Sequence, residues 1–326
     1  MMTRRASGTR QQQQGLALIT AVLVVAIVAT VATTLALGEQ VWLRQAQNVA
    51  DRAQAESLRQ GALGYAAILL TRDGNQSKDT DSQSSLWAQP LPPLPVENGM
   101  IVFAVSDAQG RFNLNNLVNK GAPSQNDIEV FKRLLTSQGL DPGLTDTLIS
   151  WMNPGSNTGM GADADIEYLN LPQPYRAAKQ ALSSVDELRL VKGFTASVVE
   201  KLRPYVTALP VYTKVNVNTA SDQVLAALFP NPPAAAVLQS LLDSRKTKPI
   251  TNSTDFQNLV PAGISGPRPE LYEFKTSYFL VTIDIRYGRL QRRTEALVER
   301  TRGQPAKVLW HQLPPLQLKT SPDEKT

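Results

Sequence analysis

The feature that most constrains this chain is an uncharged apolar run near its N-terminus. Residues Leu16 to Leu37 read LALITAVLVVAIVATVATTLAL, and at about 1.5 Å of helical rise each these 22 residues span roughly 33 Å. That length matches the hydrocarbon core of a bilayer. The polar side chains within the run are threonines whose hydroxyls are expected to bond back to their own helix: Thr20, Thr30, Thr33 and Thr34. The run therefore predicts a membrane-spanning helix.

Charges on either side of the run predict its orientation. Arg4, Arg5 and Arg10 precede it, and Glu39 follows it closely. By the positive-inside rule, the N-terminus lies in the cytoplasm and the remainder of the chain outside it. The alternative is a buried helix of a soluble core, although such helices are usually shorter or amphipathic.

The helical pattern continues beyond the apolar run. No proline occurs from residue 1 to 89, which predicts one helix from about 16 to 70 with a length of roughly 80 Å. Its first half would lie in lipid, and its second half would present an apolar stripe to a globular domain. The stripe residues recur at steps of three to five: Trp42, Ala46, Val49, Ala53, Leu58, Ala62, Tyr65 and Leu69.

Composition excludes several classes of function. Cysteine is absent, which excludes disulfides, thiol catalysis and Cys-ligated metal centres. His311 is the single histidine, so a multi-histidine metal site is excluded as well. No P-loop, dinucleotide-binding fingerprint or nucleophile motif occurs, and we predict no enzymatic activity. The formal charge of +5 is a weak sign of nucleic-acid binding, because three arginines lie before Gly15 and the remaining basic residues nearly balance the 28 acidic ones.

The rest of the chain is strand-like at both ends and helical between them. Strands are predicted over 100–105 and 111–114, with a turn at 107–110 in which Gly110 takes a positive φ. A hairpin over 277–301 reverses at Tyr287-Gly288, and a last strand is predicted over 306–312. Helices are predicted over 126–138, 143–152, 185–191, 196–202, 222–228, 234–245 and 253–260. Ser221 and Ser253 are the predicted N-caps, and the Pro-rich stretch 71–98 predicts an exposed loop.

The N-terminal features together resemble the type IV pilins and pseudopilins. A short basic leader ends at Gly15, an apolar helix starts at Leu16, and an amphipathic extension follows. The resemblance implies that a prepilin peptidase cleaves between Gly15 and Leu16 and methylates the new N-terminus. The family normally has a glutamate at the fifth mature position, where this chain has Thr20. A subunit without that glutamate resembles the K-type minor pseudopilin of the type II secretion system.

Internal segments support the same resemblance over nearly the whole chain. They are DAQGRFNLNNL, the region of Tyr168 and Pro174-Tyr-Arg176, SVDELRLVKGF and VNVNTAS. The implied fold class is α+β: a pilin-like fold, with a long N-terminal helix packed on an antiparallel sheet, and a large α-helical insertion domain. The implied parts are a leader at 1–15, a membrane half-helix at 16–37, an amphipathic half-helix at 38–70, a pilin-like domain at 71–120 and 263–313, an insertion at 121–262 and a disordered tail at 314–326.

The resemblance also implies a function. The chain would be a single-pass protein of the inner membrane with a periplasmic C-terminal domain. It would form the initiation and tip complex of the pseudopilus with the I- and J-type minor pseudopilins and contact the major pseudopilin, and nucleic acid is not an expected partner. Two alternatives remain open. One is a competence-type DNA-binding protein that uses helix-hairpin-helix pieces around Gly193, and the other is a periplasmic scaffold with an uncleaved anchor.

An acidic loop is the candidate metal site. Asp163, Asp165 and Glu167 alternate in a Gly-rich stretch, and Asn153 could add an amide oxygen. Hard oxygen ligands in a flexible loop suit calcium, although the loop is not an EF-hand, because Pro174 occupies its twelfth position. The resemblance implies calcium at an equivalent loop, where the family usually has aspartate in place of Asn153. A solvated acidic loop is the alternative.

Overall fold

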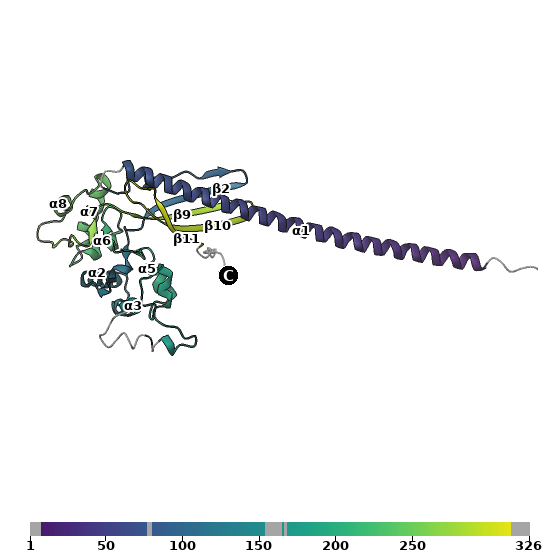
Figure 1. Cartoon of the computed structure of the whole chain (residues 1–326), viewed down its shortest axis with the longest axis horizontal. Coiled ribbons are helices and arrows are strands. Elements are labelled where there is room, and N and C mark those ends of the chain that lie inside the picture. Colours follow the sequence, from purple (N-terminus) through teal and green to yellow (C-terminus); the bar gives the residue numbers. More distant parts are fainter. Residues whose placement is uncertain (1–7, 77–79, 154–164, 166–167, 314–326) are drawn as a thin grey trace, which may run out of the picture.

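The computed structural model describes residues 8–76, 80–153, 165 and 168–313. Helix α1 (Gly8–Gln76) runs alone for half its length and then lies on a five-stranded antiparallel sheet (Figure 1). The sheet order is β1-β2-β9-β10-β11, formed by β1 (Leu94–Val96), β2 (Gly99–Asp107), β9 (Tyr278–Tyr287), β10 (Leu290–Glu299) and β11 (Lys307–Gln312). We call this part, with the second half of α1, the sheet body. The predicted α+β fold with a long N-terminal helix on an antiparallel sheet is confirmed.

The core of the sheet body lies between α1 and one face of the sheet. Strand β9 buries alternate side chains, because successive residues of a strand point to opposite faces. These side chains are Phe279, Val281, Ile283 and Ile285. The predicted hairpin is confirmed, since β9 and β10 pair from Tyr287↔Leu290 to Tyr278↔Glu299. Gly288 has φ +54 at the reversal and lies beside Asp51 of α1, where the contact of the helix with the sheet body begins.

The buried face of α1 differs from the predicted stripe. Trp42 and Val49 are 70% and 66% exposed, because the sheet body reaches the helix only from about Asp51 onward. Tyr65 is also largely exposed and touches the sheet body through an edge-on contact with Phe103. Steps of three to five residues let the predicted stripe drift between helix faces, whereas a fixed partner selects one face at 3.6 residues per turn. The buried positions are Ala55, Arg59, Ala62, Leu63, Ala66, Leu69, Leu70 and Asp73.

A second core is built from short helices inserted between β2 and β9. Its elements are β3 (Phe112–Asn113), η2 (Leu114–Leu117), β4 (Val118–Asn119), β5 (Ala122–Pro123), α2 (Gln125–Ser137), α3 (Leu144–Met152), η3 (Val185–Leu190), α5 (Ala196–Leu202), β6 (Val206–Thr207), β7 (Val215–Asn216), α6 (Asp222–Leu228), α7 (Ala235–Thr247), α8 (Ser253–Leu259) and β8 (Tyr272–Glu273). We call residues 112–273 the helical body. It lies beyond and beside the end of α1 that is farthest from the N-terminus (Figure 1).

The insertion extends further in sequence than the predicted 121–262. Phe112, Leu117 and Leu271 all belong to the core of the helical body rather than to that of the sheet body. The predicted strand at 111–114 is reduced to β3, which pairs in parallel with β6 and joins no strand of the main sheet. The stretch 71–98 is not simply an exposed loop, because it holds a short 3-10 helix, η1 (Leu86–Ala88), with Trp87 buried in the core of the sheet body.

The structure tests the predictions for two helix caps, one helix and one glycine turn. Ser221 caps α6 as predicted, since its hydroxyl accepts from the Val224 amide at 3.3 Å. Ser253 is not a cap; Asn252 is, because its side-chain oxygen accepts from the Asp255 amide at 2.8 Å. The predicted helix at 185–191 is a 3-10 helix. Gly110 does not take a positive φ; its small size is needed because a Cβ there would lie 2.8 Å from the Thr219 hydroxyl.

Candidate functional site

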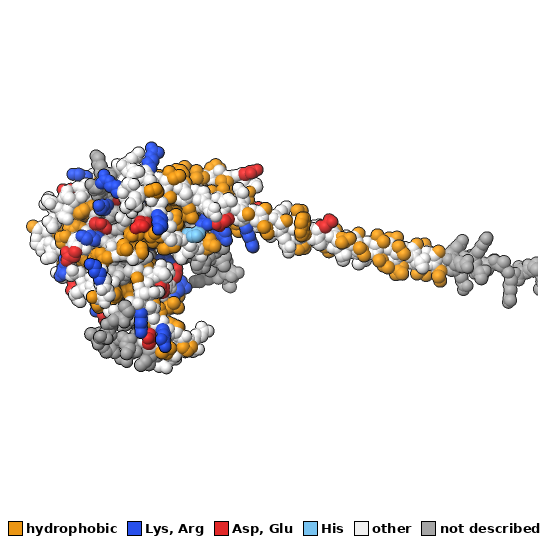
Figure 2. Space-filling model, in the orientation of Figure 1, with side chains coloured by type: hydrophobic (Ala, Val, Ile, Leu, Met, Phe, Trp, Pro, Cys, Tyr) orange, Lys and Arg blue, Asp and Glu red, His pale blue; other side chains and the backbone are white. Residues whose placement is uncertain are grey.

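The first half of α1 offers a long apolar surface that packs against no other described part of the chain. Among the described residues, α1 is the one helix long and apolar enough to cross a membrane, and the share of its most apolar window buried in the structure is 0%. Figure 2 shows this apolar rod projecting from the globular part. The threonines behave as predicted: Thr20 donates to the Ala17 carbonyl at 3.0 Å and Thr30 to the Ala26 carbonyl at 2.8 Å. The polar groups of this segment are therefore satisfied without water.

Apolar side chains continue along α1 above the membrane-length run. Val41, Trp42, Leu43 and Val49 are each more than half exposed, and none of them reaches the sheet body. Charged residues such as Arg44 and Arg52 alternate with them. A surface of this kind on an anchored helix indicates contact with other protein chains rather than with the chain's own fold.

The residues of the predicted processing site lie at the start of this surface. Gly15 is within α1, and Leu16 is 70% exposed. Thr20 is a neutral residue, so position 20 carries no charge that could pair with a neighbour. Its hydroxyl donates a hydrogen bond to the Ala17 carbonyl of its own helix. Cleavage and methylation at this site stay predictions.

Half of the predicted calcium ligands fall outside the described residues. These two ligands are Asp163 and Glu167. Asn153 and Asp165 are both described, and Asn153 is buried. The Asp165 carboxylate accepts from the Lys179 ammonium at 2.7 Å and from the Ala177 amide at 3.2 Å. The hydrogen bond from Lys179 is the main cause of its lowered pKa, so Asp165 is an ionised oxygen donor at neutral pH. Within the described ranges, no three acidic or histidine side chains gather as a metal site.

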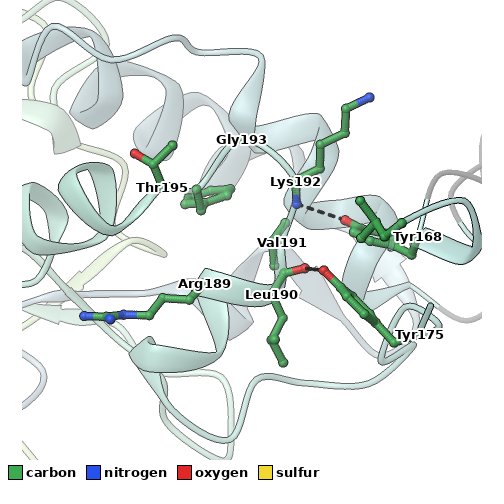
Figure 3. Close-up of a pocket in the computed structure, with 10 residues that line it drawn as sticks. Tyr168, Tyr175, Arg189, Leu190, Val191, Lys192, Gly193 and Thr195 are labelled. Atoms are coloured by element: carbon green, nitrogen blue, oxygen red, sulfur yellow. Dashed lines mark hydrogen bonds between the residues drawn. The ribbon is translucent and has the colours of Figure 1, made fainter. Parts of the chain in front are cut away.

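The hairpin around Gly193 forms one wall of a cavity of about 450 Å³ in the helical body. Tyr168 and Tyr175 are stacked on the opposite side, with ring centroids 5.3 Å apart. The Lys192 amide donates to the Tyr168 hydroxyl at 3.1 Å, and the Tyr175 hydroxyl donates to the Leu190 carbonyl at 3.0 Å (Figure 3). Gly193 has φ +85, as its turn requires. In a DNA-binding hairpin, backbone amides of this turn would face a phosphate, but here Tyr168 already occupies one of them.

The two arginines of this hairpin are also paired with its own carboxylates. Arg203 pairs with Asp186 at 2.6 Å and with Glu200 at 3.0 Å. Arg189 reaches the same Glu200 at 2.9 Å. Phosphate binding needs several cations that are not neutralised by the protein itself. The geometry therefore favours a structural role for the hairpin, against the DNA-binding alternative.

Three asparagines of the NLNNL motif turn out to clamp the helical body together, a role that sequence reasoning missed. The Asn113 side chain accepts from the Leu209 and Asn115 amides and donates to the Val211 carbonyl and the Thr213 hydroxyl. Asn115 and Asn116 bind the backbones of Leu182, Leu209 and Thr213 in the same way. The density of asparagines at the end of a predicted strand was the available signal, but their partners lie up to about 100 residues away.

A buried arginine fixes the end of α1 to the sheet body. Arg300 forms ion pairs with Asp73 of α1 and Asp81 of the following segment, and it donates to the Thr276 carbonyl at 2.8 Å. Its guanidinium also lies 4.6 Å from the centre of the Phe279 ring. Both carboxylates are almost fully buried, so this cluster sets the position where α1 ends and the globular part begins.

Comparisons with known proteins agree with this arrangement. The family model described as type II secretion system protein K matches in two parts, at residues 110–211 and 215–271. Type II secretion system protein K of Pseudomonas aeruginosa is 33% identical over 310 residues, which cover 92% of each chain. The protein of the same description from Klebsiella pneumoniae is 28% identical over 304 residues, which cover 89% of this chain and 93% of that one.

A solved structure shares the fold. It is described as the GspK-GspI-GspJ complex from the type II secretion system of enterotoxigenic Escherichia coli. The matching chain has a TM-score of 0.62 and 24% sequence identity, and the alignment covers 80% of this chain and 99% of that one. At that identity the likeness shows the fold alone.

Proposed function

The chain belongs to the type II secretion system protein K family and is a minor pseudopilin, and we propose that it starts and caps the periplasmic pseudopilus at its tip. The observation that carries this proposal is the placement of the helical body. It lies beside and beyond the end of α1 that is farthest from the membrane segment (Figure 1). A bulky body at that end would crowd a subunit stacked above it, whereas the exposed lower part of α1 is free to pack against subunits below.

Thr20 supports the same position. A charged fifth residue in lipid is costly unless it pairs with a neighbour, and in the pilin family the glutamate there is thought to pair with a free terminal amine. Because Thr20 is neutral and bonded to its own helix, the chain makes no such contact with a subunit above it. We therefore expect about one copy per pseudopilus, which quantitative mass spectrometry of sheared filaments would measure. Many copies along the shaft would contradict the capping role.

The proposed partners are the I- and J-type minor pseudopilins, in addition to the major pseudopilin. Support comes from the solved complex that contains a chain of this fold together with two such subunits. The exposed apolar residues Val49 and Ala53 of α1 are the proposed contact. Val49→Glu with Ala53→Glu should weaken co-purification with both partners and lower secretion. Gln239→Glu, on an exposed face of α7, is the matched control and should leave both unchanged.

The proposed location is the inner membrane, with the N-terminus in the cytoplasm and the globular part in the periplasm. The basic leader and the apolar rod support this orientation. The chain would act by assembly rather than catalysis. An alkaline phosphatase fusion after Leu313 should be active and a fusion within the leader inactive, because that enzyme works only in the periplasm; the reverse pattern would contradict the orientation.

Processing at Gly15 is the sharpest test that separates this proposal from an uncleaved anchor. Gly15→Leu should block removal of residues 1–15, because the peptidase needs a small residue at the bond. Gly8→Leu changes another leader glycine and should leave cleavage normal. Intact-mass spectrometry of the purified chain distinguishes the two, and normal maturation of Gly15→Leu would show that the cleavage site is elsewhere.

Calcium at the acidic loop is a further part of the proposal. Asp163, Asp165, Glu167 and Asn153 would hold the ion, and Asp165 supports this as an ionised carboxylate. A cation bound only by the folded chain raises the melting temperature. The full chain in detergent should therefore melt higher in millimolar calcium than in chelator, and Asp163→Ala with Asp165→Ala should remove the difference. Asp243→Ala, on exposed α7, is the control and should preserve it.

A further inference from the structure

The two bodies are joined where the chain leaves β2 and where it returns to β9. Gln109 ties these two crossings together. Its backbone carbonyl accepts from the Asn216 amide at 2.9 Å, and its side-chain oxygen accepts from the Ser277 amide at 2.6 Å. Its side-chain nitrogen donates to the Glu273 carboxylate and to the Lys214 carbonyl. Residues 107–109, 214–216 and 273–277 therefore form one hydrogen-bonded joint.

The joint holds two carboxyl groups that form no ion pair with any residue the structure describes. Asp107 is buried, and its carboxylate accepts from neutral donors: the Gln109 amide at 2.7 Å, the Asn216 side chain at 2.8 Å and the Thr219 hydroxyl at 2.6 Å. Among the described residues, neither Asp107 nor Glu273 has a cation within salt-bridge distance. Burial raises the pKa of Asp107, and burial with the nearby charge of Asp107 raises the pKa of Glu273 to about 7.

The cations around the joint are weakly placed or already engaged. Lys214 and Lys275 act on Glu273 from a distance, and the Lys214 ammonium donates to the Pro269 carbonyl at 3.1 Å. Arg111 acts on Asp107 without a direct contact. Arg300 is shared by two other carboxylates, Asp73 and Asp81. Of the cations that the structure describes, none is therefore positioned to balance Asp107 and Glu273 together.

The hydroxyls beside Asp107 can serve either protonation state. The Thr219 hydroxyl lies 3.3 Å from the Asn216 carbonyl as well as 2.6 Å from the carboxylate. The Thr276 hydroxyl donates to the Tyr278 carbonyl at 3.2 Å and also lies within bonding reach of Asp107. Each hydroxyl can therefore turn to a backbone carbonyl and accept a hydrogen bond from a protonated carboxyl. No buried polar group is left unpaired by the change.

We propose that Asp107 and Glu273, which share Gln109 as a hydrogen-bond partner, make the joint between the two bodies proton-linked: a proton held on these carboxyl groups keeps the helical body firmly on the sheet body, and its loss loosens the joint. The direction follows from linkage. A carboxyl that binds a proton more tightly in the closed joint stabilises the closed joint at low pH. A freely exposed glutamate has a pKa near 4.5. The free energy that favours the closed joint therefore falls as the pH rises from about 4.5 to about 7. The orientation of the helical body relative to α1 would then respond to the pH outside the inner membrane.

Hydrogen exchange of the full chain in detergent tests this proposal at pH 5.5 and pH 8.0. Protection of the amides at 214–218 and 273–278, corrected for intrinsic rates, should fall about tenfold between the two, as expected for a pKa raised by more than one unit. Protection within the central parts of β9 and β10, at 280–285 and 292–297, is the internal reference and should not change. Glu273→Gln should remove the fall, and the exposed Glu270→Gln should keep it.

Equal protection of the joint at both pH values in the parent chain would overturn the proposal, as would a fall that persists in Glu273→Gln. A measurement without substitutions covers the case in which Glu273→Gln does not fold. The carboxyl carbon of Glu273, followed by NMR in the parent chain, should titrate with a midpoint above 6. A midpoint near 4.5 would mean that the joint binds no proton in this range.

Discussion

The contacts that hold the elements together inside the sheet body differ in kind from those inside the helical body. The sheet body buries side chains of long strands under one long helix, and the central pairs β2–β9 and β9–β10 are each fixed by a continuous register. In the helical body, no described helix exceeds thirteen residues, and helices of that length are marginal by themselves in water. Its segments are positioned by side-chain amides that bind backbone groups far away in sequence. The difference predicts that single polar substitutions act on the two bodies in different ways.

The largest effect is expected where the sheet body does depend on charge. Arg300→Ala leaves Asp73 and Asp81 buried without their cation, which should cost about 3–5 kcal/mol of unfolding free energy. Arg300→Lys keeps the charge and should lose less. Arg293→Ala is the control, because its pair with Asp284 is exposed and worth at most about 1 kcal/mol. Denaturant unfolding of the full chain in detergent measures all three, and equal losses for Arg300→Ala and Arg293→Ala would contradict the role of the buried cluster.

The next largest effect tests the asparagine clamps of the helical body. Asn113→Ala removes partners from the Leu209 amide, the Val211 carbonyl and the Thr213 hydroxyl, which should cost about 3 kcal/mol. Hydrogen exchange should rise in the helical body and stay low in β9 and β10. Asn231→Ala, at an exposed position, is the matched control. If exchange rises equally in both bodies, they unfold as one unit and the comparison fails.

The smallest effect concerns a helix cap. Ser221→Ala removes the acceptor for the Val224 amide at the start of α6 and should cost about 1 kcal/mol. Ser197→Ala, an exposed residue inside α5, should be nearly neutral. The melting temperatures of the two variants provide the measurement. A melting temperature of Ser221→Ala equal to that of the parent chain would show that the start of α6 does not need its cap.

The sequence predicted the parts of this fold that rest on local rules. An apolar run without charge specifies the anchor whatever follows it, and alternation with a Tyr287-Gly288 reversal specifies the β9–β10 hairpin. The bounds of α5 and α6 agree with the predicted 196–202 and 222–228. Each helix follows a local hydroxyl cap: Ser221, which was predicted, and Thr195, which was not. Among the candidate site residues, the backbone bonding of Thr20 was predictable for the same reason: its partner lies three residues away.

Only the tertiary structure decided which face of α1 is buried, how far the insertion extends and what the polar motifs bind. Tyr65 belongs to the same periodic stripe as Ala62, yet the position of the sheet leaves it largely exposed. Asn113 reaches Leu209, and Arg300 reaches Asp73, across separations of 96 and 227 residues. No local sequence pattern predicts such pairings, because the secondary-structure propensity of an asparagine or an arginine does not depend on its partner in the folded chain. What they meet is set by the packing of the two cores, and that packing also gave Asp107 and Glu273 a common hydrogen-bond partner in Gln109.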